Sequence, residues 1–150
     1  MVRLATFSDI AFLIEFQMAM ALETENVMLD KGIVTKGIEN LFHDPAKGKY
    51  YVAELGNELI GCLMTTYEWS DWRNGNMLWI QSVYVNKAHR GKGVYKQMYQ
   101  HIKQLVHTSA DFRGIRLYVD KTNHAAQRVY QQLGMNGEHY QVFEWMKSEP

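Results

Sequence analysis

Residues 83–95 have the sequence VYVNKAHRGKGVY: an apolar strand, a short basic turn with two glycines, and the start of an amphipathic helix. Backbone N–H groups in the first turn of a helix lack intrahelical partners, and the helix dipole gives them partial positive charge. Gly91 and Gly93 let the backbone curl so that successive N–H groups point at one spot, while Arg90 and Lys92 add full positive charge. The stretch therefore predicts a pyrophosphate site.

Two common glycine motifs do not fit this stretch. The triphosphate-binding loop needs a glycine, four further residues, then Gly-Lys and Ser or Thr, which residues 91–96 do not supply. The dinucleotide-binding loop needs a third glycine where this chain has Lys96, and it normally opens a series of βαβ units. The chain has one clear unit of that kind, so both kinds of nucleotide site are excluded.

The same stretch resembles the CoA pyrophosphate loop of the GNAT N-acetyltransferase superfamily, whose pattern is Gln/Arg-x-x-Gly-x-Gly/Ala after a Val/Leu-rich strand. Residues 90–94 match the pattern, whereas Tyr95 stands where the family usually has Gly or Ala, so its side chain must turn away from the phosphates. The resemblance implies a CoA-binding set made of Val83, Tyr84, Val85, Arg90, Gly91, Lys92, Gly93, Val94 and Tyr95. Taken alone, the motif also fits a basic surface turn before an ordinary helix.

Residues 123–135, NHAAQRVYQQLGM, form a second motif. Asn123 is a good N-cap, the apolar residues that follow fall on one helical face, and Gly134 suits the left-handed position that ends a helix. The motif is similar to the family's second one, with Met135 in place of Phe. The resemblance implies that Asn123 contacts CoA and that Tyr130 contacts CoA and protonates the departing thiolate. The alternative for Tyr130 is an aromatic residue in a helix–sheet core.

The remaining patterns predict an α+β fold. Expected strands cover 2–6, 50–55, 58–68, 77–86, 115–120 and 140–146, and expected helices cover 9–24, 35–42, 91–107 and a segment beginning at 123. This order is similar to the GNAT fold: a single domain over residues 1–150, with a mixed, mostly antiparallel sheet of about six to seven strands and helices on both faces.

The first helix is apolar on most sides, with a second stripe formed by Phe12, Phe16 and Met20. We expect either the next helix or a partner subunit to cover that stripe, so the sequence allows a homodimer. The first residues form an alternating strand rather than a signal peptide, and no apolar run is long enough to span a membrane.

Composition predicts a soluble globular protein in the cytoplasm. The chain has 150 residues, 47% of them hydrophobic, and its 16 basic and 16 acidic side chains cancel. This balance calls for neither nucleic acid nor an anionic membrane as partner. Cys62 is the only cysteine, so no internal disulfide can form and a reducing compartment is expected. The expected cosubstrate is acetyl-CoA, and no metal is expected.

The chemistry that the resemblance implies is direct acetyl transfer from acetyl-CoA to a primary amine, on a small molecule or a peptide. Backbone N–H groups at 83–85 would stabilise the thioester oxygen, and Tyr130 would act as general acid. Many relatives carry Glu or Asp where this chain has Gln81. Gln81 can orient a water or an amine, but it cannot accept a proton.

The acceptor site is expected to contain carboxylates and aromatic side chains. Its candidates are Glu23, Glu25, Glu68, Trp69 and Trp72. The alternatives are solvated surface carboxylates, and a tryptophan packed across the hairpin onto Trp79. Two further functions stay open: a CoA-binding sensor that has lost catalysis, and a phosphate-dependent interaction module.

Overall fold

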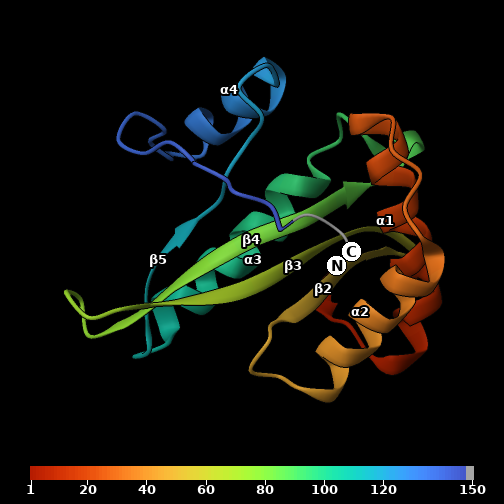
Figure 1. Ribbon diagram of the computed structural model, residues 1–150, viewed down its shortest axis with the longest axis horizontal. Coiled ribbons are helices and arrows are strands. Elements are labelled where there is room, and N and C mark those ends of the chain that lie inside the picture. The colour runs from red at the N-terminus through yellow and green to blue at the C-terminus, as the bar shows by residue number, and fades with distance from the viewer. Residues whose placement is uncertain (148–150) are drawn as a thin grey trace. The chain divides into compact units, whose positions relative to one another are not determined.

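The computed structural model describes residues 1–147. The chain forms two compact units, residues 1–117 and 118–150. The first unit holds the whole sheet with three α-helices, and the second holds one helix followed by irregular chain as far as residue 147 (Figure 1). The single domain over 1–150 stays a prediction.

The elements alternate much as the sequence patterns predict. The first unit contains β1 (Val2–Leu4), α1 (Ile10–Glu25), α2 (Lys31–His43), β2 (Lys49–Leu55), β3 (Glu58–Ser70), β4 (Gly75–Val85), α3 (Val94–Thr108) and β5 (Phe112–Arg116), and the second contains α4 (His124–Gln132). Two 3₁₀ turns, Phe7–Asp9 and Lys87–His89, precede α1 and follow β4.

The sheet has five strands in the order β1-β2-β3-β4-β5 among the described residues. The first three pairings are antiparallel, and β5 joins β4 in parallel, so the sheet is mixed as expected. The turn between β3 and β4 is where the Asn-Gly pair predicts it, with Asn74 in the left-handed region at φ 46°. The α+β class is confirmed.

Helices cover both faces of the sheet (Figure 1). On one face, α1 and α2 pack over a core that includes Leu13, Ile14, Phe16, Ile38, Leu41, Tyr50, Val52 and Cys62. On the other face, α3 lies so close that a Cβ on Gly61 would be 3.4 Å from atoms of both Val94 and Met98. Since alternate residues of a strand point to opposite faces, β2 can serve both layers: Val52 faces α1, and the Tyr51 ring contacts the His101 ring of α3.

Two strand predictions are wrong. The sheet has five strands rather than six to seven, because residues 140–146 form no strand in the structure. Their alternating pattern indicates a segment suited to a sheet, but it cannot supply the neighbouring strand that pairing requires. The strand predicted at 115–120 begins earlier, as β5, because Gly114 is part of the strand and not a turn. A Cβ on Gly114 would lie 2.8 Å from Cε of Met77, so a side chain at this position would have to displace the flexible end of that methionine.

Within residues 1–147, none of the helices combines the length and the apolar character that a membrane crossing requires.

Candidate acyl-CoA site

The basic glycine loop has the conformation that an anion site needs. It follows the 3₁₀ turn after β4 and leads into α3, whose first backbone bond runs from Gln97 N to Gly93 O at 3.0 Å. Gly91 and Gly93 both adopt left-handed φ values, +74° and +79°, and a Cβ built on either one meets no atom within 4 Å. The space in front of the α3 N-terminus is therefore open, and the residues present fit a pyrophosphate group.

The edge of β4 beside this loop is free along its second half. Pairing with β5 covers Asn76 to Trp79 only, so no described strand of the first unit pairs with residues 80–85 on that side. Figure 1 shows that β5 diverges from β4 towards the C-terminal end of β4. Backbone N–H and C=O groups along this stretch, such as those of Val83, are available to an extended ligand, whereas the Val85 carbonyl accepts from Arg90 Nε.

A β-bulge interrupts β4 at the middle of this free edge. Met64 pairs with Gln81 and Cys62 pairs with Tyr84, so two residues of β4, Ser82 and Val83, lie opposite one residue of β3. Ser82 has a φ of 55°, which is uncommon for a residue with a side chain. The bulge turns the backbone near Val83 out of the regular ladder, as bulges beside active sites commonly do.

A buried glutamine on α1 holds the bulge in place. Nε2 of Gln17 donates to the carbonyl oxygen of Ser82 at 3.1 Å, and Gln17 is only 6% exposed. The thiol of Cys62 contacts the same carbonyl at 3.8 Å, and burial raises the pKa of this thiol to about 12, so it stays protonated. Gln17 is not among the residues predicted from the sequence, although a lone amide on the apolar face of a helix is a usable signal.

Replacement of Gln17 by Leu is expected to lower the free energy of unfolding by about 1–3 kcal/mol, because the Ser82 carbonyl loses its amide partner inside the protein. Urea unfolding measures this change. Gln97→Leu on the exposed face of α3 is the control, and it should stay within about 0.5 kcal/mol of the wild type. Equal effects for the two variants would contradict a role for Gln17 in holding the bulge.

Two side chains of the loop turn away from its open centre. The Arg90 guanidinium folds back onto β4, where Nε donates to Val85 O at 2.8 Å and Nη2 lies 2.5 Å from Oε2 of Glu23. The Tyr95 ring lies against the Tyr99 ring of α3, with centroids 6.3 Å apart. Lys92 is exposed at the loop, so its charge remains available there.

Glu68 and Gln81 belong to the paired strands β3 and β4, where Glu68 is opposite Met77 and Gln81 is opposite Met64. Gln81 donates to Thr66 Oγ1 at 3.1 Å, which fixes the orientation of its amide. Oε1 of Glu68 accepts from Trp79 Nε1 at 3.2 Å and from Arg116 Nη1 at 2.5 Å. The negative charge of Glu68 is therefore compensated by an arginine.

The three predicted acceptor carboxylates thus differ in charge environment. The hydrogen bond from Arg90 lowers the pKa of Glu23, so that carboxylate is ionised at neutral pH and paired. Glu68 is paired with Arg116. Glu25, at the exposed end of α1, forms no ion pair within residues 1–147.

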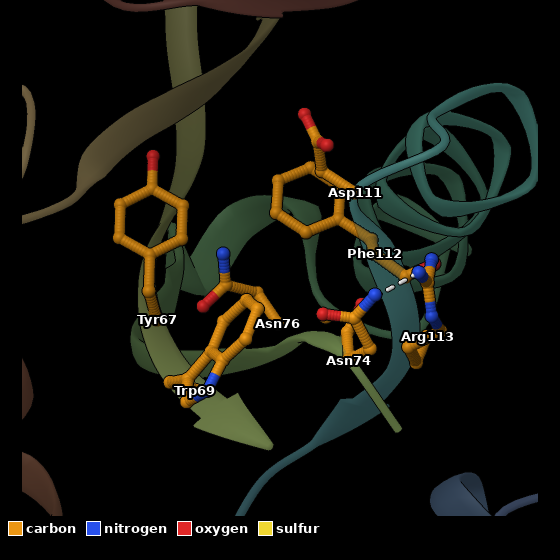
Figure 2. A pocket seen from close by; sticks show the side chains of 8 residues that line it. Tyr67, Trp69, Asn74, Asn76, Asp111, Phe112 and Arg113 are labelled. Carbon is orange, nitrogen blue, oxygen red and sulfur yellow. Dashed lines mark hydrogen bonds between the residues drawn. The ribbon is translucent and has the colours of Figure 1, made fainter. Parts of the chain in front are cut away.

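The predicted aromatic residues of the acceptor site lie elsewhere. Trp69 lines a pocket of about 460 Å³ between the β3–β4 hairpin and the start of β5, together with Tyr67, Asn76 and Phe112 (Figure 2). This pocket is at the first residues of β4, roughly 30 Å along the strand from the glycine loop at about 3.3 Å per residue. Trp72 is 90% exposed at the hairpin tip. The residues lining this pocket include neither Glu68 nor Trp72, so it does not unite the three candidates. The packing of a hairpin tryptophan onto Trp79 stays a prediction.

The second unit has the local structure expected of the second motif. The Asn123 side chain caps α4 by accepting from Ala126 N at 3.1 Å, and Gly134 ends the helix with a φ of +88°. Tyr130 lies in the last turn of α4 and is half-buried, and burial raises the pKa of its phenol. The phenol therefore keeps its proton at neutral pH, as a general acid must.

Comparisons with known proteins agree with this arrangement. The model of the acetyltransferase (GNAT) family matches residues 16–135. A solved structure of a possible acetyltransferase from Clostridium difficile 630 is 40% identical, covers 99% of this chain and 98% of its own, and superposes with a TM-score of 0.93. No curated protein matches the chain.

More distant structures share the fold. An acetyltransferase predicted in Clostridium acetobutylicum, solved with acetyl-CoA, is 18% identical, with 99% and 95% of the two chains covered and a TM-score of 0.74. An aminoglycoside acetyltransferase from an uncultured soil metagenomic sample, solved with sisomicin, is 16% identical, with 99% and 96% covered and a TM-score of 0.79. The resemblance inferred from the two motifs is confirmed, and the chain belongs to the GNAT acetyltransferase family.

Proposed function

We propose that this protein transfers the acetyl group of acetyl-CoA directly to a primary amine. The observation that carries the proposal is the continuity of the free β4 edge with the open glycine loop. A ligand with an extended, amide-bearing arm and a pyrophosphate matches both parts: the arm lies along residues 80–85 and the pyrophosphate at the start of α3. CoA has this composition.

In the reaction, the neutral amine attacks the thioester carbonyl carbon, the carbon–sulfur bond breaks, and the CoA thiolate takes up a proton. The bulge at Ser82 supports the proposal that the backbone N–H groups near Val83 stabilise the negative charge that develops on the thioester oxygen. Tyr130 is the proposed general acid, on the basis of the family motif around it and its protonated phenol.

The acceptor amine must lose a proton during the reaction. Residue 81 is Gln and cannot accept that proton, so another group must take it. Gln81 orients the amine or a water, and the proton leaves through water. Glu68 is a poor candidate for the base, because it is bound to Arg116, and Glu23 is bound to Arg90 in the free protein. Glu25 retains an uncompensated charge and is the proposed attraction for a cationic acceptor.

The experiment that tests the function monitors release of free CoA from acetyl-CoA across a panel of amines. The panel contains a polyamine, an amino acid, an aminoglycoside, and peptides with either a free N-terminus or a lysine. We expect turnover with at least one amine, rising with pH above neutrality because the amine must lose its proton to attack. Binding of CoA with no turnover on any amine would indicate a CoA-binding sensor instead. If CoA did not bind at all, the phosphate-dependent interaction module would be the remaining function.

A further inference from the structure

A small contact network joins the end of α1 to the glycine loop. Oε2 of Glu23, in the last turn of α1, lies 2.5 Å from Nη2 of Arg90, the first residue of the loop motif. Oε1 of Glu23 accepts from the Tyr84 hydroxyl at 3.4 Å, and Arg90 Nε donates to Val85 O at 2.8 Å. One carboxylate therefore connects three segments: α1, β4 and the loop.

Aromatic packing extends the same network into the core. The ring of Tyr84 stacks on buried Phe16 of α1, with centroids 5.2 Å apart and planes 29° apart. Cζ of Arg90 lies 5.4 Å from the centroid of the Tyr84 ring. Tyr84 thus packs between α1 and the loop arginine. A movement of Arg90 would therefore change the contacts that hold the end of α1.

The position of Glu23 has an electrostatic cost that Arg90 offsets. A carboxylate in the last turn of a helix opposes the helix dipole. The Arg90 guanidinium offsets this cost, but its positive charge is then engaged by Glu23 and is not directed at an anion in the loop. The two side chains are 43% and 36% exposed, and such pairs shift an equilibrium by at most about fivefold, so a ligand with several negative charges can displace the carboxylate.

We propose that Glu23 and the phosphates of CoA compete for Arg90. In the free protein, Glu23 is a positioning residue that holds the guanidinium against the end of β4. When CoA binds, Arg90 turns to the phosphates, Glu23 loses its partner, and the last turn of α1 with residues 26–30 is freed. The inference rests on the proposed CoA site.

A double-mutant cycle on CoA affinity tests the competition. Calorimetry measures the dissociation constant of CoA for the wild type, Glu23→Gln, Arg90→Gln and the double variant. We expect Glu23→Gln to tighten CoA binding about threefold to fivefold, because Arg90 no longer has to leave a carboxylate. In the Arg90→Gln background the same change should alter affinity by less than about 1.5-fold, since the competed cation is gone.

A matched control distinguishes the effect of the Glu23–Arg90 pair from the effect of removing any one negative charge from α1. Glu15→Gln removes a carboxylate from the same helix, one that is paired with Lys31 instead of the loop, and should leave CoA affinity unchanged. Amide hydrogen exchange gives a second readout, because Asn26 N and Val27 N close the end of α1 on Leu22 O and Ala21 O. CoA should speed exchange of these two amides in the wild type, and Glu23→Gln should speed it without CoA.

The outcomes distinguish this inference from the proposed function. If the wild type does not bind CoA, the proposed function fails and the competition fails with it. If CoA binds but Glu23→Gln has the same effect with and without Arg90, the pair is not the mechanism and only the inference is overturned. Weaker CoA binding by Glu23→Gln would also overturn it, because Glu23 would then be holding Arg90 in the orientation that CoA needs.

Discussion

Replacement of Tyr130 by Phe is expected to lower kcat by about 10²–10⁴-fold, the usual contribution of a general acid. The substitution keeps the ring and its packing and removes only the proton that the CoA thiolate would take. Acetyl-CoA affinity should change little. Steady-state kinetics with the best amine of the panel, together with calorimetric titration of acetyl-CoA, measures both quantities.

The pH dependence provides a further check on Tyr130. Burial raises the pKa of this phenol, so the wild-type kcat should fall only when the pH rises through that raised value and the acid is lost. The Phe variant should lack this fall. Tyr140→Phe, at a tyrosine 80% exposed in the same unit, is the control and should keep the wild-type kcat. A Tyr130→Phe enzyme with normal kcat would identify Tyr130 as a packing residue.

Replacement of Gly93 by Asp should abolish most CoA binding, with a loss of at least about 100-fold. The new carboxylate would stand at the start of α3, where the pyrophosphate is proposed to bind, and repulsion between charges about 4 Å apart is worth several kcal/mol near a protein surface. The left-handed φ of +79° adds strain for any side chain. Calorimetry measures the affinity, and circular dichroism checks that the fold remains.

Gly56→Asp is a closely matched control for that experiment. Gly56, in the turn between β2 and β3, also has a left-handed φ, +63°, and a Cβ there also meets nothing within 4 Å. It should cost similar stability and leave CoA affinity intact. If both variants bind CoA as well as the wild type does, the loop is not the pyrophosphate site.

The glycine loop could be predicted from the sequence because its requirements are local. Gly91 and Gly93 lie within one turn of the helix that they precede, and both adopt the left-handed backbone that the motif requires. The same holds for Asn123 and Gly134, which cap and end α4 as expected. In these segments the residue that determines the conformation is only a few positions from the residue that adopts it.

The direction of Arg90 could not be predicted, because its partner Glu23 is 67 residues away in the sequence. Motif matching assigns the arginine to the phosphates, and only the packing of α1 beside β4 reveals the competing carboxylate. Distance in sequence also explains the misplaced start of β5. Gly114 pairs with Met77 on the neighbouring strand and lies under its side chain, and a sequence pattern records no such pairing.

The irregularity at Ser82 also bears on solubility. An unpaired strand edge invites the strand of another molecule, and repeated pairing of that kind leads to fibrous aggregates. A foreign strand needs a regular ladder of donors and acceptors, and the bulge at Ser82 and Val83 interrupts that ladder at the middle of the free edge of β4. The feature that is proposed to present backbone groups to acetyl-CoA therefore also makes the edge a poor template for self-assembly. A substitution that straightened β4 at this point should therefore increase aggregation as well as lower the proposed acetyltransferase activity.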